Sequence, residues 1–326
     1  MSKISALYPL RFRPVLRQYL WGGRRLATDL GKCLGPANDY AESWEIVDRG
    51  EDQSIVAVGP LAGNTLGALV HKYGATLFGI HHPQPRFPLL FKFLDAQQQL
   101  SVQVHPSDSQ AALLDPPDLG KTEAWVVLAA NPGSYIYAGL RPECDRESLD
   151  RAIKDGACEA CIARIEPRAG DCIFLPAGVV HALGPGLLIA EIQQSSDTTY
   201  RLYDWNRRGK DGRPRELHVE QALAVIDFDY GPVKPQTPQP TERPHVERLV
   251  ACDKFVLDRW RFAAPQDAGG DNRCHILAVL EGQVDVAGDP AGTPLGKGDV
   301  LLLPAELGAT EFAPRSASVL LDIYLP

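Results

Sequence analysis

The stretch LSVQVHP, residues 100–106, decides how the rest of the chain can be arranged. Side chains alternate between the two faces of a β-strand. The three apolar residues of the stretch would therefore share one face, and Ser101, Gln103 and His105 would share the other. A strand with one dry face and one face of serine, glutamine and histidine does not suit an ordinary apolar core. We therefore expect it to present polar atoms into an enclosed space.

Strand-like runs bounded by turn residues continue on both sides of this stretch, and they favour an all-β sandwich or barrel architecture. Helical spacing occurs at residues 65–78 and 216–226, and helical insertions are expected at about 107–119 and 146–158. Residues 230–244 contain five prolines and predict a linker. The expected organisation is a catalytic domain over residues 1–229, this linker, and a C-terminal β domain over residues 245–326.

One pattern occurs twice and indicates two related β units. Gly-Asp, four further residues and Pro-Ala occur at residues 170–177 and again at residues 298–305. The first copy is followed by His181, whereas the second has no histidine at the same place. If the chain contains a duplication, the first unit has kept a site and the second is degenerate.

Composition excludes several classes of protein. The 326 residues are 44% hydrophobic and 23% charged, which is normal for a globular chain of one large or two smaller domains. The net charge of -8 argues against a nucleic-acid partner. No run reaches the roughly 18 apolar residues of a membrane helix, and residues 1–17 lack the apolar region of a secretory signal. We expect no nucleic-acid partner and no membrane association.

The seven cysteines are odd in number and scattered, which suits free thiols in a reducing compartment. This favours a cytoplasmic protein. Cys158 and Cys161 form a CxxC pair that could be redox-active or half of a zinc site. Because no second pair stands at ligand spacing, we interpret them as two thiols on a helical segment.

Lys92 interrupts the apolar run of residues 89–94. Lysine is almost never fully buried without a partner. Either the run is an edge strand with the lysine extended to solvent, or the ammonium group points into a polar cavity. The polar face of the following strand favours the cavity.

Gln103, His105, Glu123 and His181 suggest a metal site. Gln103 and His105 are neighbours on one strand face, Lys121 and Glu123 would likewise share a face, and His181 follows a Pro-x-Gly turn. Catalytic zinc takes nitrogen and oxygen ligands of these kinds. A single histidine is nevertheless more often an ordinary hydrogen-bonded residue, and spacing alone leaves that alternative open.

Three segments resemble the signature segments of the class I mannose-6-phosphate isomerases (phosphomannose isomerases). These are SVQVHP at 101–106, GKTEAW at 120–125 and PAGVVHA at 176–182. Residues 170–181 are also similar to the second motif of the cupin superfamily. The resemblance runs from about residue 21 to residue 207, with a weaker cupin-like C-terminal unit, and the length resembles the short bacterial form.

The resemblance implies a mainly β fold of two cupin-type (jelly-roll) β-barrel units with helical insertions, the second of them degenerate. It implies one Zn²⁺ per chain, bound by Gln103, His105, Glu123 and His181. The implied activity is an aldose–ketose isomerisation in carbohydrate metabolism, in which mannose 6-phosphate and fructose 6-phosphate are interconverted by proton transfer through an enediolate. The partner would be a small sugar phosphate, and the chain a monomer or homodimer.

The resemblance also suggests roles for several charged residues. The segment from Glu191 to Arg201 resembles the active-site segment of that family, in which the corresponding arginine is catalytic. We expect Arg201 to stabilise the enediolate or bind the phosphate, and Glu191 to be a candidate proton carrier. Lys121 is the rival base or an electrostatic helper. Ser101 and Lys92 are candidates for contacts with phosphate or hydroxyl groups.

Two other functions remain as alternatives. An Fe(II)-dependent cupin oxidoreductase would use two histidines and one carboxylate with open positions. The additional Gln103 and the many Lys and Arg side chains argue against it. A non-enzymatic sugar-binding protein on a decayed cupin fold is the third reading.

Overall fold

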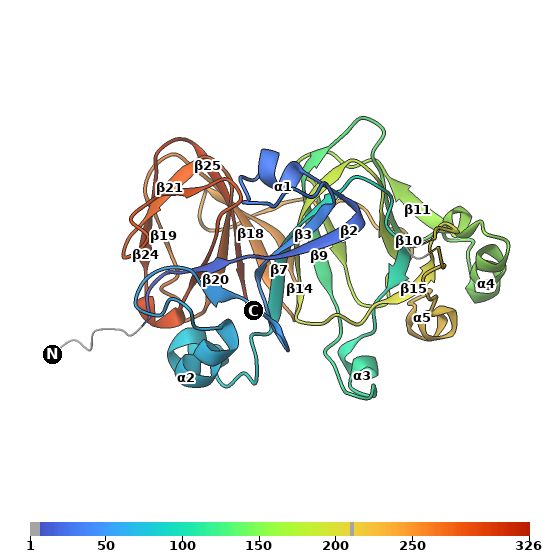
Figure 1. Cartoon of the computed structure of the whole chain (residues 1–326), viewed down its shortest axis with the longest axis horizontal. Helices are drawn as coiled ribbons and strands as arrows, with labels where there is room; N and C mark the ends of the chain where they lie inside the picture. Colours follow the sequence, from blue (N-terminus) through green and yellow to red (C-terminus); the bar gives the residue numbers. More distant parts are fainter. Residues whose placement is uncertain (1–6, 209–211) are drawn as a thin grey trace.

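Two β-rich units lie side by side in the computed structural model, which describes residues 7–208 and 212–326 (Figure 1). The N-terminal unit consists of a six-stranded and a five-stranded sheet. The six-stranded sheet has the order β12 (Cys172–Leu175), β9 (Glu123–Ala130), β14 (Leu187–Gln194), β7 (Leu89–Ala96), β3 (Tyr40–Ile46) and β2 (Val15–Gly23). The five-stranded sheet has the order β11 (Ile162–Ile165), β10 (Ile136–Leu140), β13 (His181–Leu183), β8 (Val102–Val104) and β15 (Tyr200–Tyr203).

The C-terminal unit repeats this plan with one long and one short sheet. The long sheet has the order β16 (Gln239–Pro240), β17 (Val246–Ala251), β18 (Val256–Phe262), β25 (Ser318–Tyr324), β20 (His275–Glu281), β23 (Val300–Leu303), β1 (Leu10–Arg13) and β6 (Ile55–Val56). The short sheet has the order β19 (Gln266–Ala268), β24 (Thr310–Pro314), β21 (Gln283–Val286) and β22 (Leu295–Gly296). A small ribbon pairs β4 (Asp48–Arg49) with β5 (Asp52–Gln53).

Helices lie at the edges of the two units. The α-helices are α1 (Arg25–Thr28), α2 (Leu66–Phe78), α3 (Asp108–Ala111), α4 (Arg146–Lys154) and α5 (Val219–Val225). Short 3₁₀ helices are η1 (Gly79–His81), η2 (Cys158–Cys161) and η3 (Ala305–Leu307). In the described part of the chain, none of these helices has the length and apolarity needed to span a bilayer.

The two long sheets pack back to back through one apolar core. Alternation along β14 sends Leu188, Ala190 and Ile192 into this shared core, where they meet residues of β20 and β25 such as Ile276 and Leu321. The opposite faces of the two sheets point inward, each into its own unit. Every central strand is therefore covered on both sides, which explains why these strands are apolar runs interrupted only by the residues of the inner faces.

The structure has a mainly β, cupin-like fold, as predicted. The strand order β12-β9-β14-β7-β3-β2 recurs as β23-β20-β25-β18-β17-β16. The repeated turn makes the same backbone bonds in both units. In the N-terminal unit, Gly170 N donates to Val127 O and Val127 N donates to Asp171 O. In the C-terminal unit, Gly298 N donates to Val279 O and Val279 N donates to Asp299 O. The repeat seen in the sequence therefore corresponds to the same strand connection in both units.

The beginning of the chain belongs to the sheet of the C-terminal unit. Leu10 of β1 pairs with Leu302 of β23, on the far side of the expected domain boundary. The proline-rich segment bridges both units, because Gln236 N donates to Cys172 O while β16 joins the long C-terminal sheet. The proposed boundaries at residues 229 and 245 remain predictions.

Helix starts follow their capping residues closely. Thr65 caps α2 by accepting a bond from Ala68 N, and Ser107 forms a capping box with Gln110 at α3. The helix predicted at residues 216–226 is shorter than expected. His218 has a non-helical backbone because its own N–H donates to Arg201 O and its Nδ1 accepts from Arg201 N.

A buried histidine of the C-terminal unit carries a charge that contributes to stability. His275 Nδ1 lies 2.7 Å from Asp322 Oδ1, and its Nε2 lies 3.1 Å from Asp271 Oδ1. Burial acts to lower the pKa of His275, but attraction from Asp322 and Asp271 outweighs it and raises the pKa to about 10. The imidazolium is therefore the folded form at neutral pH.

We expect the interactions of His275 with Asp322 and Asp271 to make the stability of the protein depend on pH. Because the pKa of His275 is higher in the folded state, its contribution is complete below about pH 6.5 and disappears as the pH rises through about 10. Free energies of unfolding measured in denaturant should favour the wild type over His275→Gln by on the order of 2–4 kcal/mol at pH 6. A difference that stays constant from pH 6 to pH 10 would contradict this expectation.

Candidate functional site

Three buried side chains converge at one end of the N-terminal unit. Glu123 begins β9, His181 begins β13, and His105 follows β8 directly. His181 Nε2 lies 3.3 Å from Glu123 Oε1, and His105 Nε2 lies 3.5 Å from Glu123 Oε2. Their ligand atoms all lie within 4.8 Å of one another, and Glu123 Oε1 is buried without a hydrogen-bond partner, while Oε2 is paired with Lys121. A buried carboxylate between two imidazoles, with one oxygen unpartnered, fits a metal ion.

Both imidazoles have the tautomer that a metal requires. His105 Nδ1 lies 2.9 Å from Thr198 O, and His181 Nδ1 lies 2.9 Å from Val179 O. A carbonyl oxygen only accepts, so each Nδ1 carries the proton and each Nε2 presents its lone pair to the site. Such outer hydrogen bonds orient metal-binding histidines in proteins generally.

The charges in this cluster favour binding of a cation. Burial lowers the pKa of His105 well below its ordinary value and also lowers that of His181, so both are neutral at pH 7. Burial acts to raise the pKa of Glu123, but Lys121, together with His105 and His181, outweighs it and lowers the pKa. The centre therefore consists of two neutral imidazoles and one carboxylate.

Gln103 is in position to complete the set. It pairs with His181 across β8 and β13, and its side-chain amide lies 3.2 Å from His181 Nε2. The nitrogen and oxygen of an amide group are interchangeable by rotation about the terminal bond, and the oxygen is the atom that binds metals. The structure thus brings together all four residues predicted as ligands.

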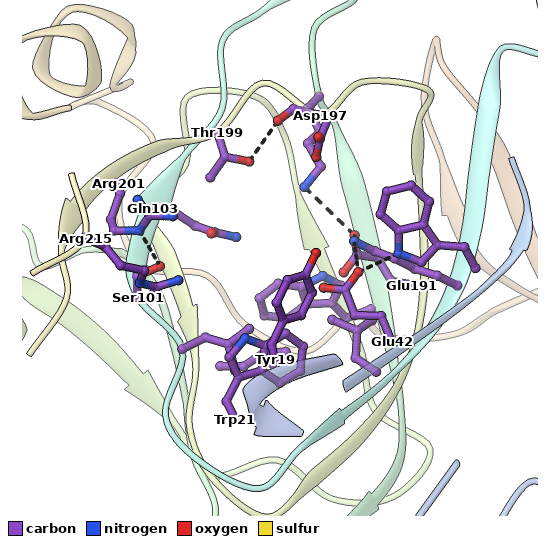
Figure 2. A pocket seen from close by; sticks show the side chains of 17 residues that line it. Tyr19, Trp21, Glu42, Ser101, Gln103, Glu191, Asp197, Thr199, Arg201 and Arg215 are labelled. Atoms are coloured by element: carbon purple, nitrogen blue, oxygen red, sulfur yellow. Dashed lines mark hydrogen bonds and ion pairs between the residues drawn. The ribbon is translucent and has the colours of Figure 1, made fainter. Parts of the chain in front are cut away.

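A cavity of about 350 Å³ opens beside this cluster (Figure 2). Its lining comes from both sheets of the N-terminal unit and from the segment that follows β14. The lining residues are Tyr19, Trp21, Glu42, Trp44, Lys92, Leu94, Leu100, Ser101, Gln103, Lys121, Trp125, Leu183, Glu191, Asp197, Thr199, Arg201 and Arg215. Every residue predicted for catalysis or substrate contact is among them.

One wall of the cavity is a buried network of opposite charges. Lys92 Nζ lies 3.2 Å from Glu191 Oε1 and 3.7 Å from Glu42 Oε2, and Trp44 Nε1 donates to Glu42 at 2.5 Å. Because β7 lies between β14 and β3, Lys92 is not on an edge strand and its ammonium group faces the cavity. Burial raises the pKa of Glu191 to about 7, although Lys92 opposes the shift. This carboxyl group therefore exchanges a proton near neutral pH.

The opposite side of the cavity carries two arginines (Figure 2). Arg201 Nε donates to Ser101 Oγ at 3.4 Å, and its NH1 donates to Glu216 O at 2.8 Å. Among the described residues, no carboxylate comes within 4.0 Å of the Arg201 guanidinium. Arg215 is held by Asp204 and is 40% exposed at the mouth. Glu191 is paired with Lys92 and not with Arg201.

Lys121 joins the metal cluster to the charged wall. Its Nζ lies 2.8 Å from Glu123 Oε2, 3.1 Å from His105 Nε2 and 4.0 Å from Glu191 Oε1. The side chain is buried rather than solvent-facing. It is thus placed as a cation between the candidate ligands and the candidate proton carrier.

Several pocket residues were not predicted from the sequence. Tyr19, Trp21, Glu42 and Trp44 lie on β2 and β3, and Arg215 follows residues 209–211. The Glu-Ser-Trp-Glu segment at 42–45 belongs to a fully buried strand. Two acidic residues within such a strand are the sequence signal that could have indicated a polar cavity.

A second set of hydrogen bonds holds the metal cluster in place from outside. Asp118 accepts a bidentate pair from Arg49 and a hydrogen bond from Thr198 Oγ1 at 2.9 Å. Thr198 in turn accepts at its carbonyl the bond from His105 Nδ1. The insertion between β8 and β9 therefore fixes the orientation of His105.

The chain is similar to known proteins along almost its whole length. Residues 10–143 match the model of the phosphomannose isomerase type I catalytic domain. Mannose-6-phosphate isomerase ManA of Bacillus subtilis is 35% identical over 307 residues, with 92% of this chain and 94% of that protein covered. Mannose-6-phosphate isomerase of Streptococcus mutans is 35% identical over 306 residues, with 93% and 95% covered.

Solved structures agree with these sequence matches. The crystal structure of the mannose 6-phosphate isomerase from Bacillus subtilis superposes with a TM-score of 0.89 at 30% identity and covers 98% of this chain and 100% of that chain. The structure of a putative mannosephosphate isomerase from Archaeoglobus fulgidus has a TM-score of 0.78 at 22% identity, covering 99% of each chain. The second match supports the fold alone.

Proposed function

The chain belongs to the type I phosphomannose isomerases, enzymes that interconvert mannose 6-phosphate and fructose 6-phosphate. From that premise we propose a role in the reaction for each residue of the site. The family is metal-dependent, and we propose Zn²⁺, one per chain, as the metal. The convergence of His105, Glu123 and His181 beside the cavity, next to its lining residues Gln103 and Lys121, is the observation that carries this proposal.

Gln103, His105, Glu123 and His181 would hold the zinc ion. Neutral imidazole and carboxylate ligands suit zinc. When bound, zinc supplies Lewis-acid polarisation of the sugar oxygens at C1 and C2. The chain itself provides everything else that the reaction needs.

Glu191 is the proposed carrier of the proton between C1 and C2. A general base works best when its pKa lies near the operating pH, and the buried Glu191 meets that condition at about 7. Lys92 holds the carboxylate in place at 3.2 Å. Lys121, 4.0 Å from Glu191, is the alternative base and otherwise stabilises negative charge on the sugar oxygens.

The phosphate is assigned to the side of the cavity formed by Ser101, Arg201 and Arg215. Lys92 is already paired with two carboxylates, whereas Arg201 has no carboxylate partner among the described residues. A free guanidinium is well suited to a phosphate oxygen. This places Lys92 near the sugar hydroxyls rather than near the phosphate.

The overall charge of the site agrees with a dianionic substrate. The cavity and its ligand set contain four carboxylates and four cationic side chains, which are Glu42, Glu123, Glu191, Asp197, Lys92, Lys121, Arg201 and Arg215. When Glu191 is ionised, these charges cancel. A divalent ion then leaves two positive charges, which match a phosphate group of nearly two negative charges.

Arg215→Ala is expected to raise KM for mannose 6-phosphate about 10- to 100-fold, with a smaller change in kcat. The substitution removes a charge-assisted hydrogen bond to the phosphate. Because this bond is equally strong in the ground state and the transition state, its loss weakens substrate binding and leaves kcat nearly unchanged. Steady-state kinetics check it, and the exposed Arg151→Ala on α4 is the matched control. An unchanged KM for Arg215→Ala would remove this residue from the phosphate site.

The activity and its metal are tested together by a coupled assay of mannose 6-phosphate conversion. The purified chain should turn over substrate, lose activity with a chelator and regain it with stoichiometric zinc. No turnover in a zinc-loaded sample would refute the isomerase assignment for this chain. Recovery with another metal, but not with zinc, would refute the identity of the ion alone.

The Fe(II) oxidoreductase and the non-enzymatic sugar-binding protein are not favoured. Oxygen-dependent turnover with stoichiometric iron would be required for the first, and ligand binding without turnover for the second. A cytoplasmic location and a monomeric or homodimeric state remain part of the proposal.

A further inference from the structure

The C-terminal unit contains a cavity of about 320 Å³ that the isomerase reaction does not use. It opens among the ends of β17, β18, β20 and β25 on the inner face of the long sheet. Its lining residues are Thr241, Glu242, Arg243, Val246, Arg248, Asp258, Trp260, Gly269, Asp271, His275, Asp322 and Tyr324. Most of these side chains are charged or aromatic, which is unusual for the inside of a β unit whose role is only structural.

The strand registers place this cavity at the position of the catalytic pocket. Glu123 pairs with Leu175 at the start of β9, as His275 pairs with Leu303 at the start of β20. His275 therefore occupies the position of the metal-binding carboxylate. Two residues further along β9, Trp125 pairs with Glu191. Two residues further along β20, Leu277 pairs with Asp322.

The position of Lys92 in the charged wall is occupied by an aspartate in the C-terminal unit. Lys92 pairs with Glu191 between β7 and β14, and Asp258 pairs with Asp322 between β18 and β25. The wall of Lys92 and Glu191 thus recurs as Asp258 and Asp322. Both residues are buried on the inner face.

Three of the four candidate metal ligands, in contrast, are replaced in the C-terminal unit, and the remaining glutamine does not line the cavity. Gln103 pairs with His181 across β8 and β13, and the corresponding pair across β19 and β24 is Gln266 with Phe312. Ala268, two residues after Gln266, takes the position of His105. His275 has both ring nitrogens bonded to carboxylates, so it offers no lone pair. This cavity has kept a polar wall without a metal site.

The polar groups of the cavity are fixed in position by one another. Asp258 accepts from Arg248 Nε at 2.5 Å and from Tyr324 Oη at 3.0 Å. Asp322 accepts the bond from His275 at Oδ1, and within the described residues no hydrogen bond reaches its other oxygen. Side chains that are held by their neighbours lose little freedom when a ligand binds.

The charges of the lining select against phosphorylated ligands. It contains four carboxylates and, with His275 protonated, three cationic groups. The excess of one negative charge is unfavourable for a dianion, whereas hydroxyl groups both donate to carboxylates and accept from arginine. Trp260 is buried under Arg243, whose Cζ lies 4.2 Å from the ring centroid, so the partly exposed Tyr324 is the ring that offers apolar surface beside these polar groups.

We propose that this second cavity binds a neutral sugar, with hydroxyl groups bonded to Asp322 and Arg248 and its ring against Tyr324. Arg248 lies at the opening, where 36% of its side chain is exposed, so a ligand reaches the cavity from solvent. The site is separate from the catalytic pocket and needs no metal. Its occupant is the uncharged counterpart of the sugar phosphate bound in the other unit.

Saturation-transfer NMR on the full chain tests the proposal with D-mannose, D-glucose and D-galactose as probes. Excess mannose 6-phosphate keeps the catalytic pocket filled, so that remaining signal comes from elsewhere. At least one hexose should show transfer, and Arg248→Ala should weaken its binding about tenfold or more. The matched control Arg315→Ala, which breaks a surface pair with Asp285 in the same unit, should bind like the wild type.

Two further measurements distinguish a loss of sugar binding from a loss of catalysis or of the fold. Isomerase activity of Arg248→Ala should stay within about twofold of the wild type, because the residue lies outside the catalytic pocket. If circular dichroism shows that Arg248→Ala is unfolded, Arg248→Gln replaces it and should weaken binding severalfold. The proposal is overturned if no hexose shows transfer, or if the cavity variant binds as tightly as Arg315→Ala.

Discussion

His181→Ala is expected to purify without stoichiometric metal and to show a kcat/KM for mannose 6-phosphate lower by a factor of about 1,000 or more. His181 is one of three groups whose ligand atoms lie within 4.8 Å of one another, so its loss leaves too few ligands to hold the ion. A metal contributes several kcal/mol to charge stabilisation in the transition state, and each 1.4 kcal/mol is a factor of ten in rate.

Elemental analysis and steady-state kinetics measure this effect. His71→Ala is the matched control, since His71 is exposed on α2 and far from the cavity lining. It should retain one metal ion per chain and full activity. If His181→Ala keeps both metal and rate, the ligand assignment is wrong even when the enzyme is an isomerase.

Glu191→Gln is expected to lower kcat by a factor of about 100 to 10,000 while zinc remains bound. The substitution keeps the shape of the side chain and removes its ability to take a proton, and general acid–base catalysis contributes a factor of this size. Because Glu191 is not one of the ligands, metal content should stay at one per chain.

Exchange of deuterium from C2 of labelled mannose 6-phosphate into water separates the proton transfer from the rest of the reaction. The exchange should fall together with kcat in Glu191→Gln. Glu42→Gln, which alters the other carboxylate beside Lys92, should affect the exchange far less. If Lys121→Ala abolishes the exchange and Glu191→Gln does not, the base is Lys121.

Local sequence signals predicted the fold class and the helices well. Thr65 and Ser107 cap α2 and α3 by bonds within four residues, which depend on no distant part of the chain. The repeated Gly-Asp turn likewise makes the same bonds in both units. Features with short-range causes were therefore visible in the sequence.

Features that depend on strand order were not visible. The cavity side of β3 is decided by its pairing of Glu42 with Leu94 and Trp44 with Lys92, some 50 residues away. A shift of one residue would have turned these side chains to the opposite face. Without the register, neither Glu42 nor Trp44 could be assigned to the pocket.

The segment at residues 216–226 shows the same limit for helices. Its apolar spacing was correct, but His218 exchanges two hydrogen bonds with Arg201 and delays the start of α5 to Val219. Tertiary contacts outweighed the local propensity. The same contacts help to hold Arg201 at the cavity.

Because β1 pairs with β23, the sheet that contains both strands can be completed only after residue 303 has been synthesised. Leu302, the partner of Leu10, is made about 290 residues after it. The edge of β1 that faces β23 therefore stays unpaired during that interval, whereas the other edge can pair with β6, and an unpaired strand edge is prone to wrong association. The N-terminal unit can assemble its own sheets before then, but β1 closes onto β23 only when the C-terminal unit has emerged. A chain that ends before residue 300 would thus keep the pairing of β1 with β6 but would lack its pairing with β23.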